Sequence, residues 1–423
     1  MLEKSTPAGT KLKIAVIAHG HPDFSAGGAE TAAYNLFQSY RQHPGVAEAH
    51  FLARIERGKH PSGMVVPHGE NEYLWDQSMH DWVFLRGLSR EAGLRKFSEW
   101  LKYLRPDIIH AHHYAHMGLE IFRIMRNTLP DVRIFLTLHE YMAICLHNGQ
   151  MIKRGSNKLC YTSSLDACHN CYPEHNRETL WLRKRHIQNH FDLIDGFIAP
   201  SEFLRDRYIA WGLPQEKITV LENAQLERTA APPRPVAEGE PCNRFGYFGQ
   251  ITEFKGLDIL LEALLHANRE SEVPLYLEVN GANLEGQPAE YREKIGRLRC
   301  ALEDKGLLQW LGAYEPRDLS RRMATVDWVV VPSIWWENSP MVIQEAFSFG
   351  RPVICSAIGG MAEKVRDGVD GIHVEPGSVI SMSSTLRAAA RNKSIWTSLS
   401  INSSERSRSH RDDITQYLMI MNL

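Results

Sequence analysis

Short apolar runs alternate with amphipathic segments along most of the chain. A short apolar run bounded by turn residues is typical of a buried parallel strand, whereas apolar residues three and four positions apart indicate a helix. In the first half this pattern predicts strands at residues 13–18, 107–110, 132–136 and 196–199. The expected helices lie at residues 29–40, around 118–126 and after Ser201, which is a favourable N-cap.

The second half repeats the alternation. Strands are expected at residues 244–248, 275–279, 309–311, 328–331 and 352–355. Helices are expected at residues 256–267, around 290–302, at 316–324 and from Pro340 onwards. The whole pattern predicts an α/β protein with two doubly wound parallel sheets, and such sheets bind ligands beyond the carboxyl ends of their strands.

A stretch rich in Pro, Ala and Gly at residues 230–241 interrupts the alternation. Such residues disfavour helices and central strands and mark a boundary. We therefore expect an N-terminal domain at residues 1–228, with a Cys-rich insertion at about 145–175, and a C-terminal domain at residues 240–405. The tail, residues 406–423, ends in apolar positions, and we expect it to pack back on the N-terminal domain.

The charges of the chain nearly balance, because 48 Lys and Arg stand against 50 Asp and Glu in 423 residues. The resulting net charge of −2 gives no basic field that would favour a nucleic-acid partner. The apolar content of 43% excludes a mostly disordered chain. No apolar run approaches the roughly 18–20 residues of a membrane span, and the N-terminus lacks a signal-peptide pattern, so we expect a cytoplasmic protein with reduced thiols.

The segment after the strand at 328–331 carries the first candidate chemistry. Ser339 is a good N-cap and Pro340 a good first helical residue, so the amides of Met341 and Val342 would lie at a helix N-terminus, which suits a phosphate. Glu337 and Glu345, eight residues apart, could hold two ends of one long polar ligand. The alternative is a helix with an ordinary acidic first turn.

A second candidate is the loop after the strand at 244–248, which contains Gly249, Gln250 and Lys255. A Lys near a helix N-terminus opposes the helix dipole, and a bound anion would remove that conflict. The alternative is a solvated surface Lys.

The loop at residues 19–28 is a third candidate, since Gly27 and Gly28 allow the backbone to approach a ligand closely. It contains neither the dinucleotide-binding Gly pattern nor a Walker A loop, and the alternative is a plain turn.

Taken in order, several motifs resemble one family. The pair Glu337 and Glu345 is followed by Ala346 and by Gly-Arg-Pro-Val-Ile at 350–354. Other matching positions are Gly249 with Lys255-Gly256, Gly312-Ala313, Pro332-Ser333, Gly359-Gly360 with Glu363, and Gly27-Gly28-Ala29-Glu30. Each match is weak alone, but the ordered set resembles the retaining GT-B glycosyltransferases of family four over nearly the whole chain.

The resemblance implies the GT-B fold, in which two Rossmann-like domains face each other across a cleft. It implies a hexosyltransferase that takes a nucleotide diphospho-sugar as donor and needs no metal for its chemistry. Glu345 would bind the ribose, Glu337 the transferred sugar and Lys255 the diphosphate, while His139 of the first domain would contact the sugar. The remaining donor-binding positions would be Gly27, Gly28, Gly249, Gln250, Ser339, Met341 and Val342. The acceptor would be a glycan, a lipid-linked molecule or a small molecule.

Two positions depart from the family pattern. The family usually has Arg where Gln250 stands, so either Arg244, Arg317 or Arg321 compensates, or phosphate binding depends on Lys255. The family often has Gly where Pro340 stands, and Pro removes one amide donor. Two other functions stay open: a catalytically silent nucleotide-sugar-binding or scaffold protein, and a GT-B epimerase. A phosphorylase would carry a lysine that binds pyridoxal phosphate, and no motif in the sequence identifies such a lysine.

Four of the seven cysteines lie close together in sequence: Cys145, Cys160, Cys168 and Cys171. A Cys-x2-Cys pair with two further thiolates suits a tetrahedral structural zinc site, for which His147, His169 and His175 are spare ligands. The alternatives are four reduced, unligated cysteines and, less favoured, an iron–sulfur cluster.

Residues 177–190 combine basic and apolar side chains, from Arg177 to His190. A basic amphipathic helix of this kind can lie on an anionic membrane surface, which would suit a lipid-linked acceptor and a peripheral place on the inner face of the membrane. We favour the alternative, a surface helix that packs Trp181 and Ile187 inward.

Overall fold

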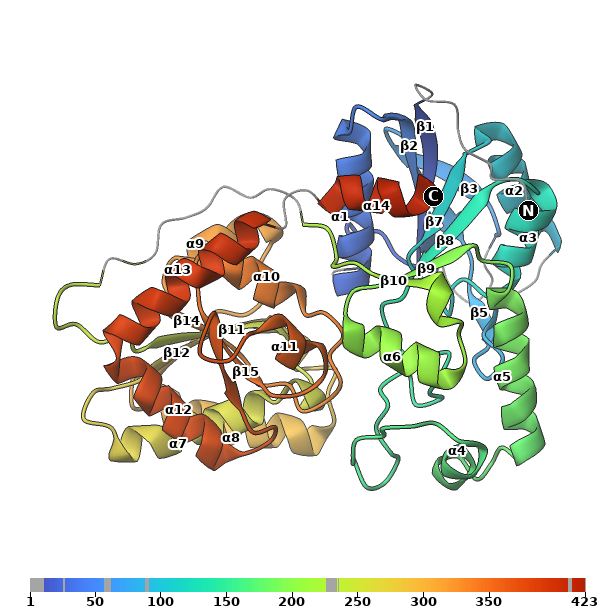
Figure 1. Ribbon diagram of the computed structural model, residues 1–423. Coiled ribbons are helices and arrows are strands. Elements are labelled where there is room, and N and C mark those ends of the chain that lie inside the picture. Colours follow the sequence, from blue (N-terminus) through green and yellow to red (C-terminus); the bar gives the residue numbers. More distant parts are fainter. Residues whose placement is uncertain are drawn as a thin grey trace. The chain divides into compact units, whose positions relative to one another are not determined.

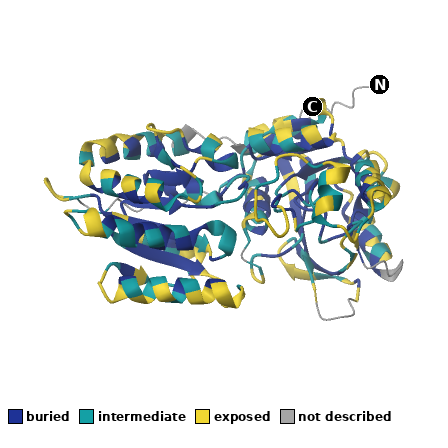
Figure 2. Ribbon diagram, turned by 90° about the horizontal axis from the view of Figure 1, so that it is seen from below, coloured by how far each residue is buried: buried dark blue, intermediate teal, exposed yellow. Residues whose placement is uncertain are grey.

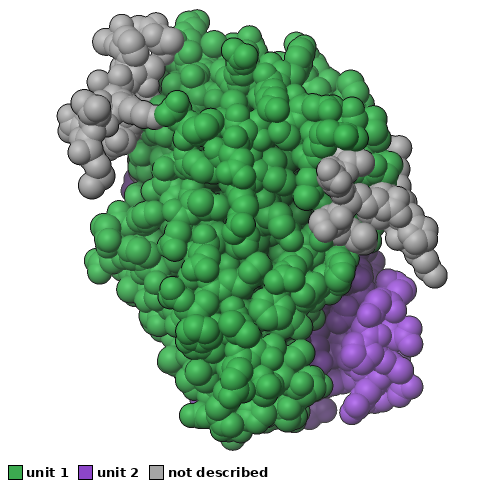
Figure 3. Space-filling view, turned by 90° about the vertical axis from the view of Figure 1, so that its right-hand side faces the viewer, with its two compact units in different colours: residues 1–226, 412–423 green, residues 227–411 purple. Residues whose placement is uncertain are grey.

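The computed structural model describes residues 11–25, 27–56, 62–87, 91–225, 234, 236–409 and 413–422. The chain forms two compact units, residues 1–226 with 412–423 and residues 227–411, which Figure 3 distinguishes by colour. Within the predicted linker, residues 230–233 and 235 lie outside the described residues. Mixed α/β structure with parallel sheets in two units confirms the predicted fold class.

Unit 1 contains an eight-stranded sheet in the order β10-β9-β8-β7-β1-β2-β4-β3. Neighbours are parallel except β3, which runs antiparallel to β4 at the edge. The strands are β1 (Leu12–Ala18), β2 (Val46–Ile55), β3 (Val65–Gly69), β4 (Glu72–Asp76), β7 (Ile108–Ala111), β8 (Arg133–Thr137), β9 (Gly196–Ala199) and β10 (Ile218–Val220). A separate small hairpin pairs β5 (Met79–Asp81) with β6 (Arg86–Gly87).

Helices cover both faces of this sheet (Figure 1). They are α1 (Gly28–Gln42), α2 (Glu91–Leu104), α3 (Glu120–Thr128), α4 (Leu165–Cys171), α5 (Arg177–Phe191), α6 (Glu202–Trp211) and α14 (Asp413–Asn422), with a 3-10 turn η1 (Gln215–Lys217). The C-terminal helix α14 packs beside α1, where Tyr417 and Met421 are buried in one apolar cluster with Phe37. The Tyr417 hydroxyl donates to the Glu222 carbonyl at 2.9 Å, so the tail is part of unit 1.

Unit 2 contains a six-stranded, wholly parallel sheet in the order β13-β12-β11-β14-β15-β16. Its strands are β11 (Arg244–Gln250), β12 (Tyr276–Ala282), β13 (Leu308–Trp310), β14 (Trp328–Val331), β15 (Val353–Ser356) and β16 (Gly371–Val374). Its helices are α7 (Leu257–Glu270), α8 (Ala289–Glu303), α9 (Leu319–Met323), α10 (Met341–Ser348), α11 (Gly359–Lys364), α12 (Val379–Arg391) and α13 (Lys393–Ser409), with 3-10 turns η2 (Glu253–Lys255) and η3 (Pro316–Asp318).

The central strand β14 shows why both sheet faces of unit 2 are covered. Trp328 and Val330 belong to the apolar cluster that includes residues of α7, α8 and α12, whereas Val329 and Val331 belong to the cluster with α9, α10 and α11. Successive side chains of a strand point to opposite faces, so a strand that is apolar at every position must be buried on both. Figure 2 shows buried strands with the exposed residues on the outer sides of the helices.

The predicted strands lie within about two residues of those in the structure, but some predictions were incomplete or wrong. No element was predicted between residues 41 and 106, where β2 to β6 and α2 lie. Ser339 is not the N-cap of α10, because Pro340 occupies that position and the helix begins at Met341. In the described part of the chain, no helix combines the length and apolar character that a membrane-spanning helix needs.

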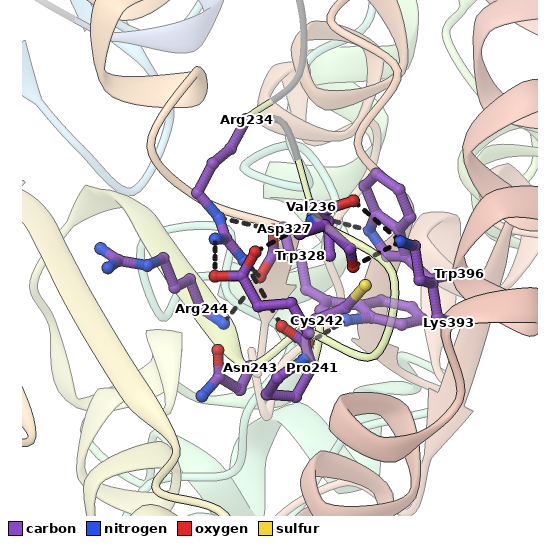
Figure 4. A network of polar contacts seen from close by, with 12 residues as sticks. Arg234, Val236, Pro241, Cys242, Asn243, Arg244, Asp327, Trp328, Lys393 and Trp396 are labelled. Carbon is purple, nitrogen blue, oxygen red and sulfur yellow. Dashed lines mark hydrogen bonds and ion pairs between the residues drawn. The ribbon is translucent and has the colours of Figure 1, made fainter.

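A polar network fastens the first segment of unit 2 to its sheet (Figure 4). Asp327, which is 1% exposed, accepts from the Arg234 guanidinium at 3.1 Å and from the Arg244 amide at 3.0 Å. The indole of Trp396 donates to the Asp327 carbonyl at 2.8 Å. Buried carboxylates need such partners, because removing them from water is costly.

We expect Asp327→Ala to lower the free energy of unfolding of unit 2 by about 3 kcal/mol, because it leaves the Arg244 amide without its acceptor and Arg234 with only the exposed Glu240 and the Pro241 carbonyl. Urea denaturation measures this change. The exposed Asp304→Ala is the matched control and should change stability by less than about 0.5 kcal/mol. A loss for Asp327→Ala as small as the control's would contradict the role of the network.

Candidate active site

An ion pair joins two loops at the carboxyl ends of β11 and β14. The Lys255 ammonium lies 2.6 Å from Glu337 Oε1. Two further donors reach the same oxygen, the Ser333 hydroxyl at 2.8 Å and the Trp335 indole at 2.8 Å. The Glu337 side chain is 9% exposed, while that of Lys255 is 29% exposed. A buried carboxylate therefore holds a partly accessible cation at the ligand-binding edge of the sheet.

The charge of Glu337 depends on these partners. Burial raises the pKa of Glu337, but the positive charge and hydrogen bond of Lys255, with the donors Trp335 and Ser333, outweigh it, so the pKa falls below its usual range. Glu337 is thus ionised at neutral pH. Glu337 can therefore accept hydrogen bonds from hydroxyl groups, and Lys255 beside it can donate hydrogen bonds to anionic oxygens.

Gly256 lets these two loops come together. It has φ of +68°, in the left-handed region, and it precedes α7 directly after Lys255. A Cβ at this position would lie 2.1 Å from the Pro332 carbonyl oxygen. The Ile334 amide also donates to the Phe254 carbonyl at 2.9 Å. Only glycine permits both the conformation and the close approach.

Gly360 has the same role on the other side of the Glu337 loop. Its amide donates to the Glu337 carbonyl at 2.7 Å, and a Cβ would lie 1.8 Å from the Asn338 carbonyl oxygen. Because a backbone atom cannot move aside as a flexible side chain can, a larger residue must displace the loop.

We expect Gly360→Ala to destabilise unit 2 by about 2–4 kcal/mol, through that displacement of the Glu337 loop. Thermal or urea unfolding measures it. Gly296→Ala is the matched control, since a Cβ there meets nothing within 4 Å inside α8. The control should leave stability unchanged or raise it slightly, and equal effects of the two substitutions would contradict this explanation.

The other donor-binding positions predicted on this unit lie at or after the carboxyl ends of the same two strands. Met341 and Val342 form the first turn of α10, whose N-terminal amides point out of the helix end, and Glu345 is the fifth residue of that helix. Ser339, Met341, Val342 and Glu345 are all half-buried. Gly249 has φ of +140° near the end of β11, and Gln250 is exposed beside it.

Arg244 cannot replace the missing arginine at Gln250. It is the first residue of β11, at the amino end of the strand, whereas Lys255 follows the carboxyl end. Arg321 is exposed and lies 3.5 Å from Asp318, and Arg317 is exposed. Arg322, which the sequence pattern did not single out, lies nearer to the carboxyl edge, but its guanidinium donates to Asn280 and to carbonyls of residues 311–313.

In unit 1, His139 belongs to a cluster of histidines at the carboxyl ends of β1, β7 and β8. His139 Nε2 lies 3.0 Å from His112 Nδ1, so one of the two rings donates to the other. The ring of His19 stacks near those of His113 and His116, with centroids 4.1 and 5.2 Å apart. The parallel strands bring together residues that are far apart in sequence.

Burial keeps five histidines of this region neutral. It lowers the pKa of His139 and of His110 to about 3 and that of His116 to about 4. The pKa values of His112 and His113 are also lowered, again mainly by burial. Burial raises the pKa of the neighbouring Glu140 to about 7. Neutral imidazoles can both donate and accept hydrogen bonds, which suits the hydroxyl groups of a sugar.

A pocket of about 470 Å³ opens beside this cluster within unit 1, and its lining includes His19, Glu30, Arg54 and His116. Glu30, in the first turn of α1, accepts from Ser25 at 2.6 Å and lies 3.2 Å from His19. Gly27 is the N-cap of α1 and Gly28 its first residue, and a Cβ on Gly27 would lie 2.1 Å from a Glu30 oxygen.

The structure does not bring the four insertion cysteines into a closed metal site. Among the described residues, the three side chains with ligand atoms all within 4.8 Å of one another are His21, Asp23 and His68. Their contacts explain that group without an ion: His21 Nε2 lies 3.0 Å from Glu72, His21 Nδ1 accepts from the Asp23 amide, and His68 lies 2.8 Å from Asp23.

Comparison with known proteins agrees with this geometry. A family model described as "Glycosyltransferase Family 4" matches residues 26–224, and one described as "Glycosyl transferases group 1" matches residues 242–392. The chain belongs to the group 1 glycosyltransferases of family 4. The two matches cover one unit each.

Curated relatives of this glycosyltransferase match only in part. It is 30% identical over 206 residues to the lipopolysaccharide 1,2-N-acetylglucosaminetransferase of Salmonella typhimurium, covering 46% of this chain and 53% of that protein. It is 30% identical over 172 residues to a D-inositol 3-phosphate glycosyltransferase of Geodermatophilus obscurus, covering 40% of this chain and 38% of that protein. The matches thus span about half or less of these relatives.

Solved structures share the fold of this glycosyltransferase over nearly its full length. Anabaena HepE in complex with UDP and glucose has a TM-score of 0.62 at 15% identity, and covers 97% of this chain and 98% of its own. The sucrose-phosphate synthase of Thermosynechococcus elongatus has a TM-score of 0.66 at 16% identity, with the same coverage. The fold of both units is therefore that of GT-B glycosyltransferases.

Sequence reasoning about this glycosyltransferase missed most of the histidine cluster. Residues 110–116 read His-Ala-His-His-Tyr-Ala-His, directly at and after a predicted strand. The rule that ligands bind beyond the carboxyl ends of parallel strands would have selected His112, His113 and His116 together with His139. Arg54 lacked such a signal, because β2 was not predicted, and Glu30 was named only as part of the match at residues 27–30, without a role.

Proposed function

We propose that this protein is a hexosyltransferase that moves a sugar from a nucleotide diphospho-sugar to a glycan, lipid-linked or small-molecule acceptor, with retention of configuration. One observation carries the proposal: the contact of Lys255 with the buried, ionised Glu337 beside the N-terminus of α10. It supports a site that binds anionic oxygens and sugar hydroxyls side by side. HepE, solved with UDP and glucose, supports the donor class.

In this reaction unit 2 would stabilise the charges that develop as the donor bond breaks. Breaking the anomeric bond leaves positive charge on the sugar and negative charge on the departing diphosphate. Lys255 and the amides of Met341 and Val342 would stabilise the diphosphate, so no metal ion is needed for that step. Glu337 would accept hydrogen bonds from the sugar, and Glu345 from the ribose hydroxyls.

The configuration at the anomeric carbon would be retained because the acceptor hydroxyl attacks the same face of the sugar from which the diphosphate leaves. A phosphate oxygen of the leaving diphosphate would take the acceptor proton. In this scheme the new bond forms from the acceptor hydroxyl to the anomeric carbon as the bond to the diphosphate breaks. His139, held by His112, would hydrogen-bond the transferred sugar from unit 1. The Gly27-Gly28 turn would approach the diphosphate through its backbone.

A lipid-linked acceptor would place part of the protein at a membrane surface, and α5 is the candidate for that contact. The expectation that Trp181 packs inward was wrong, because its side chain and that of Leu182 are about half exposed, while Ile187 is fully buried. Arg183, one of the basic residues of this helix, is also buried. Two exposed apolar side chains near Arg185 support peripheral contact with an anionic surface.

A donor-binding screen tests the proposal. Isothermal titration with UDP-, GDP- and ADP-sugars should give binding to at least one, and mass analysis with candidate acceptors should show a transferred sugar. Glu345→Ala should weaken nucleotide binding by at least about tenfold, whereas the exposed Glu293→Ala should not. No binding at millimolar concentration would overturn the transferase, and binding without transfer would favour the silent binding protein.

A further inference from the structure

The insertion between β8 and α5 buries few apolar side chains, Met151 and Ile152 among them. Residues 145–176 contain one isolated antiparallel bridge, Ile152 to Leu159, and the helix α4, which buries none of its residues. An irregular segment of this length needs another source of order. Its four cysteines are half-buried, and none forms a disulfide.

The backbone gathers these four cysteines from three parts of the insertion. Cys160 donates its amide to the Met151 carbonyl at 2.7 Å, which closes the hairpin. Cys168 and Cys171 are three residues apart in α4, so they share one face of the helix. The Arg154 amide, at the hairpin tip, donates to the Cys171 sulfur at 3.2 Å and ties the helix to the hairpin.

Amide donors aimed at sulfur are a feature of thiolates. The Arg154 amide donates to the Cys171 sulfur in this way. Bound metal would convert the thiols to thiolates and give that amide a charged acceptor.

A buried cation provides an independent observation. Arg183 is 4% exposed and lies beneath the insertion, where its guanidinium donates to the carbonyls of Met142 and Ala143. Its Nε has no hydrogen-bond partner. Glu140 is the carboxyl group that acts on its charge, but burial raises the pKa of Glu140 to about 7, so this group is only partly ionised at neutral pH. The sulfurs of Cys145 and Cys168 are close enough to act on its charge. A buried guanidinium needs a nearby anion, and four thiolates around a divalent ion form one.

We propose that Cys145, Cys160, Cys168 and Cys171 bind one structural zinc ion that fastens the insertion beside His139 and Glu140. Four zinc–sulfur bonds form as four thiols release their protons to solvent, and the net negative charge of the site neutralises Arg183. No three of the sulfurs lie within 4.8 Å of one another as placed, so the side chains must rotate to reach the spacing of a tetrahedral site. The zinc takes no part in breaking the donor bond.

Metal analysis of the full-length protein tests this site. We expect about one zinc per chain, released when a mercurial reagent titrates the thiols. The double variant Cys168→Ser/Cys171→Ser should lose the zinc, and amide hydrogen exchange should rise within residues 145–176, whereas the exposed Cys300→Ser should retain both properties of the wild type.

A readout on the wild-type protein covers the case in which the double variant does not fold. In native protein, iodoacetamide should label Cys300 but spare the four insertion cysteines until a chelator is added. Metal-free protein with four reactive insertion thiols, a disulfide among them, or the visible absorption of an iron–sulfur cluster would each overturn the proposal. None of these outcomes concerns donor binding, so the zinc proposal can be overturned while the transferase proposal stands, and the reverse.

Discussion

Lys255→Ala is expected to lower kcat by about two to three orders of magnitude, with a smaller change in KM for the donor. The reason is that the negative charge of the diphosphate grows as the sugar departs, so the ammonium stabilises the transition state more than the bound donor. With Gln250 in place of a second cation and Arg244 at the far end of β11, Lys255 has no substitute in the candidate site. Initial-rate kinetics with the donor found in the screen measures both constants.

Controls separate this effect from a loss of structure. Removing Lys255 leaves the buried Glu337 with its Ser333 and Trp335 donors but no cation, so its pKa should rise and stability should fall modestly. Lys294→Ala, which removes another partly exposed lysine paired with acids, is the matched variant and should keep wild-type kcat. A kcat for Lys255→Ala within threefold of wild type would exclude the proposed role.

The second large effect is acid destabilisation of unit 1. Histidines with folded pKa values lowered to about 3 or 4 bind fewer protons than in the unfolded chain, where the value is about 6.5. Their neutral state therefore contributes stability above about pH 6.5 that is lost as the pH falls towards their folded values. For His110, His116 and His139 together, the loss between pH 7 and 5 should be on the order of 5–6 kcal/mol.

The titration of Glu140 changes the stability of unit 1 with pH in the opposite direction to that of the histidines. Its pKa is raised to about 7, so the folded state holds a proton that the unfolded state releases, and stability falls as the pH rises from about 4.5 to 7. One carboxyl group cannot offset the whole cluster, so the net effect below pH 6.5 is destabilising. Glu140→Gln should remove this opposing contribution and steepen the loss at low pH.

Hydrogen exchange at pH 7 and pH 5, corrected for intrinsic rates, distinguishes the two units. Protection of β7 and β8 should fall strongly, while that of β11 and β14 should change little. His139→Asn should reduce the pH dependence, and His266→Asn, on α7 of unit 2, should not. Equal acid sensitivity of both sheets would contradict the assignment to the histidine cluster.

The unit 2 site could be predicted from sequence because its signals are local. Glu337, Ser339, Met341 and Glu345 all lie within 14 residues of the end of one apolar strand, and Lys255 follows another. The rule for the carboxyl ends of parallel strands then places both loops at one edge. The loop contact itself depends on Gly256 and Gly360, whose close approaches no sequence pattern shows.

Unit 1 was harder to predict, for a physical reason. Its cluster is assembled from His19, His112, His116 and His139, which follow three different strands, and β2, which brings Arg54, was not expected. On α5, periodicity suggested that Trp181 would face inward, but Arg183 occupies the buried face instead, where it binds loop carbonyls. A hydrophobic pattern cannot foresee a buried guanidinium, because its burial depends on partners elsewhere in the chain.

The return of α14 to unit 1 makes the polypeptide discontinuous: unit 2 is inserted between the body of unit 1 and its last helix. Deleting the C-terminus after residue 405 would remove Tyr417 and Met421 from the apolar cluster around Phe37. An apolar surface along α1 would then be exposed to water. A researcher who wishes to express unit 1 by itself should therefore splice residue 226 to residue 412 through a short spacer, and should attach any purification tag at the N-terminus.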